Sequence, residues 1–113
     1  MTVPKKNRKI VFQRDDDRCV SCGTTEGLTL QHRSNRKMGG SKSGALDRVE
    51  NLIVLCGIEN QLLESDADLA REGVYRGYKL RSWENPLEVP VQYPDGVFYL
   101  TERGTRIKTE RTD

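Results

Sequence analysis

Residues 28–60, LTLQHRSNRKMGGSKSGALDRVENLIVLCGIEN, hold most of the features from which a fold and a function can be inferred. They begin with an alternating apolar run that ends in His32, the single histidine of the chain. A basic loop with glycines follows, and the chain returns through an apolar run from Asn51 to Cys56. This pattern predicts a strand, a loop, a second strand and the start of a helix, an order that would bring His32, Asn51 and Asn60 together.

The length and composition predict one small domain with a thin core. With 113 residues the chain is too short for two independent cores. Only 35% of the residues are hydrophobic and 32% are charged, so hydrophobic burial needs support from another stabiliser. The three cysteines are candidates for that role.

The sequence has no feature of a membrane or secreted protein. It contains no run of eighteen apolar residues and no basic-then-apolar signal near its start. We therefore expect no membrane partner and a cytoplasmic location, where cysteines stay reduced.

Basic residues gather in two places, although the net charge is only +2. Short basic runs are by themselves typical of an ordinary solvated surface. The position of the second cluster directly after His32 favours contact with a phosphate backbone. The two clusters comprise Lys5, Lys6, Arg8 and Lys9, and then Arg33, Arg36, Lys37, Lys42 and Arg48.

Helices are predicted on both sides of this segment. A short helix is expected within residues 5–16, ending before the acidic residues 15–17. A second is expected from Glu59 through Arg71, with Gly73 as its cap. Within the first strand, alternation would place Leu28 and Leu30 on one face and Gln31 on the other.

The C-terminal third predicts packing and a hairpin. Residues 77–80 and Trp83 have the composition of a packing segment. Residues 89–101 predict a β-hairpin, because Asp95-Gly96 separates two β-prone runs. Residues 103–113 are polar and are expected to form a frayed tail.

Several motifs recur in order between residues 14 and 66: Cys19-x-x-Cys22, Gln31-His32, Asn51-Leu-Ile-Val-Leu-Cys56, and Asn60 nine positions after Asn51. This order resembles the HNH nucleases. The resemblance implies an α+β fold with a small ββα-metal core (HNH, or His-Me finger), an N-terminal helix, a cysteine knuckle and a C-terminal β-hairpin. It implies a single nuclease domain over residues 1–113, with the core at about 14–72 and an extension at about 77–102.

By this resemblance the chain is a metal-dependent DNA endonuclease that hydrolyses phosphodiester bonds. His32, Asn51 and Asn60 would form its catalytic signature. His32 would be the general base, because an imidazole can accept a proton near neutral pH. Asn51 would hydrogen-bond the region around His32 and hold its ring and loop in place.

The family places its ligands for a catalytic divalent cation, Mg²⁺ or Mn²⁺, at the positions of Gln31 and Asn60. Two neutral amides supply oxygen but no negative charge, so binding in the free protein would be weak. Either the DNA phosphate supplies the missing charge, or Glu64, one helical turn after Asn60, donates a carboxylate.

Three interpretations of the cysteines stay open. The family often holds a structural zinc with two Cys-x-x-Cys pairs, and here Glu59 stands where the fourth cysteine is expected. Zinc could be held by Cys19, Cys22, Cys56 and Glu59, which is favoured because metal binding can stabilise a small domain. Alternatively the site is lost and leaves three buried thiols, or Cys19 and Cys22 form a redox disulfide.

The expected partner is double-stranded DNA, bound mainly through its backbone. Four side chains of the loop would make those contacts: Arg33, Arg36, Lys37 and Lys42. The C-terminal part is similar to that of small HNH proteins encoded by actinobacterial phages, which implies action in the host cytoplasm and phage packaging proteins as further partners.

Two other functions fit the same residues. One is a catalytically weakened, DNA-binding member of the fold, suggested by Gln31 and Glu59. The other is a zinc-knuckle protein-interaction module that uses the acidic helix and the region of Trp83. Salt-dependent DNA affinity would separate this module from the two DNA-binding hypotheses.

Overall fold

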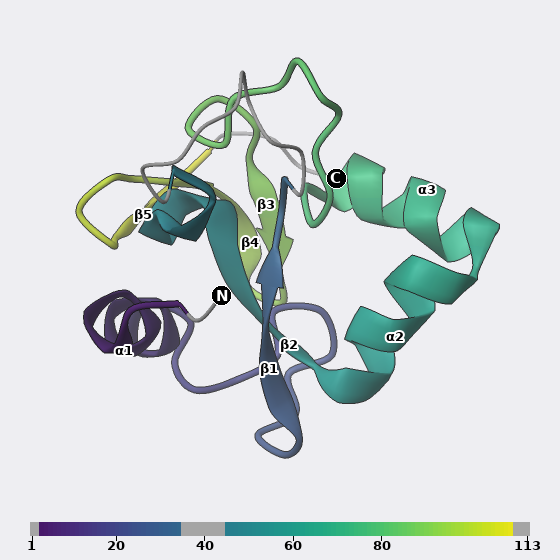
Figure 1. The fold of residues 1–113 in the computed structure, drawn as a ribbon, viewed down its shortest axis with the longest axis horizontal. Helices are drawn as coiled ribbons and strands as arrows, with labels where there is room; N and C mark the ends of the chain where they lie inside the picture. Colours follow the sequence, from purple (N-terminus) through teal and green to yellow (C-terminus); the bar gives the residue numbers. More distant parts are fainter. Residues whose placement is uncertain (1–2, 35–44, 110–113) are drawn as a thin grey trace.

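The computed structural model describes residues 3–34 and 45–109. Within them the chain forms a small α+β fold with three α-helices and two antiparallel sheets (Figure 1). The α+β class expected from the sequence is therefore confirmed. In chain order the elements are α1 (Lys5–Arg14), β1 (Leu28–His32), the 3₁₀ turns η2 (Ala45–Asp47) and η3 (Val49–Asn51), β2 (Leu52–Cys56), α2 (Gly57–Ser65), α3 (Ala67–Arg76), β3 (Val91–Tyr93), β4 (Gly96–Leu100) and β5 (Arg106–Lys108).

The β1–β2 sheet lies at the centre, with α1 on one side and α2 and α3 on the other (Figure 1). Its register runs from Leu28 opposite Cys56 to His32 opposite Leu52. Every residue of β2 is buried, as its apolar sequence predicts. Its two faces serve different cores: Leu52 and Val54 pack with α1, whereas Ile53 and Leu55 pack with α2 and the second sheet.

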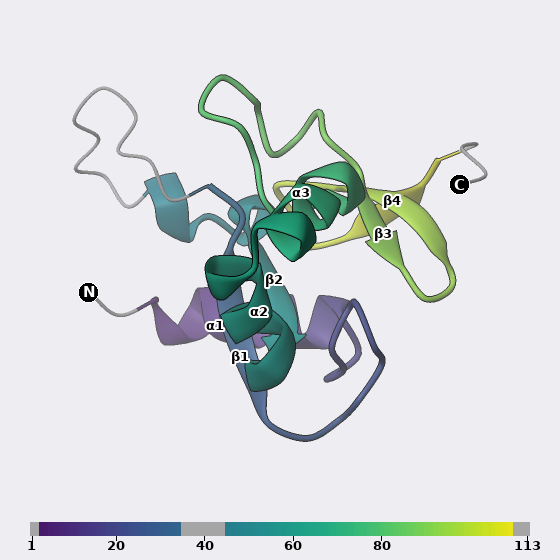
Figure 2. The same ribbon diagram turned by 90° about the vertical axis from the view of Figure 1, so that its right-hand side faces the viewer.

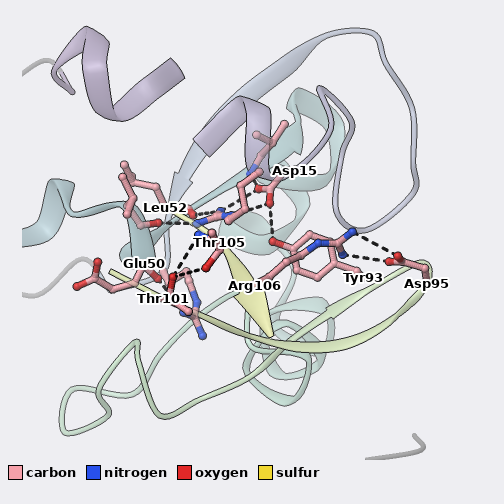
Figure 3. A network of polar contacts seen from close by, with 12 residues as sticks. Asp15, Glu50, Leu52, Tyr93, Asp95, Thr101, Thr105 and Arg106 are labelled. Carbon is pink, nitrogen blue, oxygen red and sulfur yellow. Dashed lines mark hydrogen bonds and ion pairs between the residues drawn. The ribbon is translucent and has the colours of Figure 1, made fainter. Parts of the chain in front are cut away.

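The free edge of β2 is closed not by another strand but by side chains and by the Val20 amide, which donates to the Val54 carbonyl at 2.9 Å. The Val54 amide donates to Oδ2 of Asp15 at 3.0 Å, and the Leu52 carbonyl accepts from Nη2 of Arg14 at 2.5 Å. The Tyr93 hydroxyl donates to Oδ1 of the same Asp15 (Figure 3). Burial raises the pKa of Tyr93, and the neighbouring carboxylate raises it further. Arg14 and Asp15 thus satisfy buried backbone groups that an unpaired edge would leave without partners.

The predicted helix over residues 59–71 is wrong in its bounds, because two helices occupy the region. The break falls at Asp66, whose carboxylate accepts from the amides of Asp68 and Leu69 and so starts α3. Gly73 lies inside α3, where a Cβ would come within 2.5 Å of the Leu63 side chain. The cap is Gly77 instead, with a φ of 84°.

The predicted hairpin is present as β3 and β4, but the predicted tail is wrong over residues 106–108. These residues form β5, which pairs antiparallel with β4. The turn between them is closed by a hydrogen bond from the Thr101 amide to the Thr105 carbonyl. Arg106 then stacks over the rings of Tyr93 and Phe98 and forms an ion pair with Asp95 (Figure 3).

Trp83 also departs from its predicted packing role. Tyr78, in the same segment, is buried, and its hydroxyl donates to the Gln92 carbonyl at 2.7 Å. Trp83 is 78% exposed. In the part of the chain that the structure covers, no helix has both the length and the apolar character needed to cross a membrane.

Candidate functional site

His32 ends β1 on the side of the sheet that faces α1. Its Nε2 atom lies 2.8 Å from Oδ1 of Asp47 in η2, and its side chain is 32% exposed. Asn7 of α1 holds Asp47 in turn, donating to its carbonyl at 2.8 Å. An ionised carboxylate can only accept, so Nε2 is the donor in this contact. In the neutral form of the ring the lone pair is then on Nδ1, where His32 could accept a proton.

Sequence reasoning missed Asp47. A signal was available, since Asp47 is the single acidic residue between Arg33 and Arg48. An acid in an otherwise basic loop is a candidate partner for the histidine that precedes the loop. Asp47 lies 15 positions after His32, so no local sequence pattern reveals the pairing.

Asn51 holds the backbone on both sides of residues 35–44. Its Oδ1 accepts from the Ser34 amide at 2.9 Å, and its Nδ2 donates to the carbonyls of Ser34 at 3.2 Å and Leu46 at 2.8 Å. The side chain is buried, and its backbone carbonyl accepts from the amide of Arg33 at 2.8 Å. Asn51 therefore fixes the chain on either side of the loop that follows His32.

Arg33 was expected to contact DNA, and the structure corrects this. The residue is 1% exposed, and its guanidinium donates to four backbone carbonyls. Burial lowers the pKa of Arg33 to about 10, with a further contribution from Arg14. Arg33 is an internal cross-link here. Its four acceptors are the carbonyls of Gly77 at 2.8 Å, Glu50 at 2.9 Å, Pro86 at 3.0 Å and Val89 at 2.6 Å.

The side chains of Gln31, in β1, and Asn60, in α2, lie on the opposite face of β1. Asn60 donates from Nδ2 to the hydroxyl of Thr29 at 2.9 Å. Gln31 shares that face by strand alternation and is 5% exposed, and its Nε2 has no hydrogen-bond partner in residues 3–34 and 45–109. Among the contacts described, none joins His32 to Asn60. The structure thus brings together His32, Asp47 and Asn51, and leaves Asn60 at Thr29.

The residues expected to bind a catalytic cation do not form a preformed site for one. Gln31 and Asn60 are neutral, and Oε2 of Glu64 pairs with Nζ of Lys79 at 3.3 Å. Within the described residues, the only group of three or more metal-binding side chains is the set of cysteines. Magnesium prefers carboxylate and water oxygens, which this face of β1 does not gather.

Cys19, Cys22 and Cys56 come together at the other end of the central sheet. Their sulfur atoms all lie within 4.8 Å of one another, and those of Cys22 and Cys56 are 3.8 Å apart. Two thiolates on one tetrahedral zinc are also about 3.8 Å apart, given Zn–S bonds of about 2.3 Å. The three cysteines could therefore hold a metal ion, which is the stabiliser that the thin core calls for.

Hydrogen bonds from backbone amides favour a thiolate in this cluster. Burial raises the pKa of Cys19, but amides of Cys22, Cys56 and Ser21 and the Cys22 thiol outweigh it, so the net shift is downward. The amide of Thr24 lowers the pKa of Cys22, but burial and the neighbouring sulfur atoms raise it to about 11. These opposite pKa shifts mean that Cys19 loses its proton more readily than Cys22 does.

Glu59, the expected fourth donor, lies at the edge of this cluster. Its backbone amide donates to Sγ of Cys56 at 3.5 Å, while its carboxylate accepts from the Ser21 hydroxyl at 3.1 Å. Ser21 stands between Cys19 and Cys22 in the sequence. The Glu59 carboxylate therefore accepts a hydrogen bond from Ser21, between two of the cysteines, and does not contact the sulfur atoms.

These two clusters are separate. His32 and Cys56 lie at opposite ends of the β1–β2 ladder, four residue steps or roughly 13 Å apart along the strands. No protein family, curated protein or solved structure matches the chain. The function must therefore be argued from the residues themselves.

Three of the predicted DNA contacts, Arg36, Lys37 and Lys42, lie outside the described residues. Besides the buried Arg33, the structure describes Arg48 of the same loop, which has an exposed side chain and lies 3.9 Å from Glu50.

Proposed function

We propose that this protein is an HNH-type DNA endonuclease that uses His32 to activate water for hydrolysis of a phosphodiester bond. The observation that supports this most is the 2.8 Å contact between Nε2 of His32 and Oδ1 of Asp47. It orients an imidazole that is 32% exposed, and it makes Nε2 the donor to the ionised carboxylate. In the sequence, His32 is followed directly by a segment rich in positive charge, which suits a phosphodiester substrate.

In the proposed reaction, Nδ1 of His32 takes a proton from water as the water oxygen attacks phosphorus. The bond from phosphorus to the leaving ester oxygen then breaks, that oxygen takes up a proton from solvent water, and the His32 imidazolium returns its extra proton to solvent. Asp47 would stabilise the imidazolium that forms, as a buried carboxylate does for a catalytic histidine in other hydrolases. Asn51 would act as a positioning residue, because it holds the backbone on both sides of the loop.

The divalent cation of the HNH resemblance is the least supported component. A cation would supply charge neutralisation at the phosphate, but Gln31, Asn60 and Glu64 do not make a carboxylate site for it. We therefore assign no step to it, and the DNA phosphate is the remaining source of the missing negative charge.

Zinc at Cys19, Cys22 and Cys56 is a structural component of the proposal. Cys56 lies roughly 13 Å from His32 along the sheet, so a zinc ion held by the cysteines would take no part in the reaction. Glu59 could complete the tetrahedron through Oε2, the carboxylate oxygen that does not accept from Ser21; otherwise water is the fourth donor.

DNA would be bound through its backbone by Arg36, Lys37 and Lys42, while Arg33 is left out because it is buried. The neutral ligand set favours a second candidate, a member of the fold that binds DNA and cleaves it weakly or not at all. Without a carboxylate beside Gln31 and Asn60, the protein would bind a catalytic cation weakly and would lose hydrolysis. Its binding to the DNA backbone would not be affected.

Plasmid nicking separates the two candidates. Wild-type protein, His32→Ala and an exposed control, Asp68→Asn, would be incubated with supercoiled plasmid and Mg²⁺, Mn²⁺ or EDTA. The nuclease proposal expects nicking by wild type and Asp68→Asn, and a loss of roughly 100-fold or more in His32→Ala. Salt-dependent binding with equal, negligible nicking by all three would support the second candidate.

A further inference from the structure

Trp83 is the most exposed of the large hydrophobic side chains that the structure describes, at 78%. It is also the only tryptophan in the chain. A tryptophan has a large apolar surface, so leaving it in water costs free energy that burial against a partner would recover.

The exposure of Trp83 does not come from an irregular tip. The turn around it is closed twice, by the Glu84 amide donating to the Arg81 carbonyl at 3.0 Å and by the Arg81 amide donating to Oε1 of Glu84 at 2.6 Å. Asn85 then caps the next turn, where its Oδ1 accepts from the Leu87 amide at 2.9 Å. These hydrogen bonds order the backbone on both sides of Trp83, so a partner that binds its side chain would cause little further loss of backbone entropy.

This segment is fastened to the histidine end of β1. The Arg33 carbonyl, next to His32 in the chain, accepts from the Leu80 amide at 2.8 Å. The Arg33 guanidinium reaches the carbonyls of Pro86 and Val89 farther along the same segment. Figure 2 shows the connection between α3 and β3 standing out as a loop from the body of the molecule. Trp83 therefore belongs to the same end of the protein as the proposed site.

The charges around Trp83 permit an anionic partner. Residues 77–90 contain Lys79 and Arg81 against Glu84 and Glu88, which cancel. Residues 59–76, over α2 and α3, carry five acidic and two basic side chains, a net charge of −3. DNA would therefore be repelled by the helices and not by the loop. Tyr75, 64% exposed on α3, provides a matched exposed aromatic on the repelling side.

We propose that Trp83 stacks on a nucleobase of the DNA strand bound at the His32 end of the molecule. The inference rests on the proposed function, since it takes DNA as the partner. Because every base has a π-face, the contact would favour single-stranded or unpaired positions over intact duplex and would be tolerant of sequence. It would add affinity without neutralising phosphates.

The test measures DNA affinity and tryptophan emission together. A 12-nucleotide single strand and a duplex of the same sequence would be titrated into wild type, Trp83→Ala, Trp83→Phe and Tyr75→Ala, at several salt concentrations. We expect quenching of wild-type emission, more strongly with the single strand. Single-strand affinity should fall roughly tenfold in Trp83→Ala, recover in Trp83→Phe and stay unchanged in Tyr75→Ala.

The salt dependence separates stacking from charge. The slope of log affinity against log salt should be the same in Trp83→Ala and wild type, because no phosphate contact is removed. The inference would be overturned if Trp83→Ala had a reduced salt slope or bound DNA with wild-type affinity. It would also be overturned if DNA left the emission of the wild-type protein unquenched, which would mean that Trp83 contacts another partner. If Trp83→Ala binds normally while His32→Ala abolishes nicking, only the Trp83 proposal fails. If affinity falls but wild type does not nick, only the nuclease proposal fails.

Discussion

The imidazole of His32 and the carboxylate of Asp47 form a 2.8 Å pair between the end of β1 and the turn η2. The pair fixes which ring nitrogen carries the proton, so its loss should impair proton transfer more than DNA binding. We expect Asp47→Ala to reduce nicking by roughly 10- to 100-fold, less than His32→Ala does, with DNA affinity unchanged. Single-turnover cleavage and filter binding measure the two effects. Equal cleavage by Asp47→Ala and wild type would show that the carboxylate does not orient a base.

Asn51 should matter to stability as well as to cleavage. Asn51→Ala leaves the Ser34 amide and the carbonyls of Ser34 and Leu46 without their buried partner. We expect the free energy of unfolding to fall by about 2–3 kcal/mol, measured by urea denaturation. Asn85→Ala is the matched control, because that side chain makes one described hydrogen bond at an exposed turn. Similar losses in both variants would contradict the role given to Asn51.

The elements with regular sequence patterns could be predicted, and those fixed by distant partners could not. Alternation in β1 and the apolar run of β2 identified the central sheet with its correct bounds to within one residue. β5 has only three residues and a polar sequence, and it forms because β4 offers a free edge. The break at Asp66 had a local signal, an acidic residue able to cap a helix, but the apolar spacing of a longer helix competed with it.

The site shows the same division. The positions of His32 and Asn51 at the ends of two paired strands follow from sequence. The burial of Arg33 does not, because its sequence neighbours are polar and basic and its four acceptors come from residues 17 to 56 positions away. Asn60 has the expected spacing from Asn51, yet the side of β1 that it reaches depends on how α2 packs.

Arg33 was expected to be a surface contact, but its buried guanidinium links four backbone carbonyls, and this difference can be tested. Arg33→Lys keeps the charge but cannot reach four carbonyls in a planar fork, so we expect a loss of about 3 kcal/mol in unfolding free energy. Arg48→Lys, at an exposed arginine, should change it by no more than about 0.5 kcal/mol. Thermal and urea denaturation of both variants give the comparison. If Arg33→Lys were fully stable but bound DNA more weakly, Arg33 would instead be an exposed residue that contacts DNA.

The ion pair of Asp95 and Arg106 should make a small, pH-dependent contribution to stability. Hydrogen bonding to Arg106 lowers the pKa of Asp95 below its ordinary value. The contribution is therefore present above the unfolded-state pKa, about 3.9, and is lost as the pH falls through the lower folded-state pKa. Because the Asp95 side chain is 62% exposed, Asp95→Asn should cost no more than about 1 kcal/mol at pH 7. The difference in Tm between the two proteins should therefore shrink steadily as the pH falls below the unfolded-state pKa, and it should also shrink in about 1 M salt at pH 7. A difference that persists in acid would assign the effect to packing of Arg106 on Tyr93 and Phe98.

The cysteine cluster predicts one zinc ion per chain and a fold that depends on it. Removing the metal with a chelator should lower Tm by well over 10 °C, because metal binding supplies on the order of 10 kcal/mol in small domains of this kind. Cys19→Ser and Cys56→Ser should lose the metal, as native mass spectrometry would show. Glu59→Gln tests the fourth position. If this variant keeps zinc with unchanged affinity, the fourth donor is water and not the Glu59 carboxylate, which accepts a hydrogen bond from Ser21. If purified wild type contains no metal and three thiols titrate freely, the cluster is only a set of packed cysteines, and the stability of the core must come from the closed edge of β2.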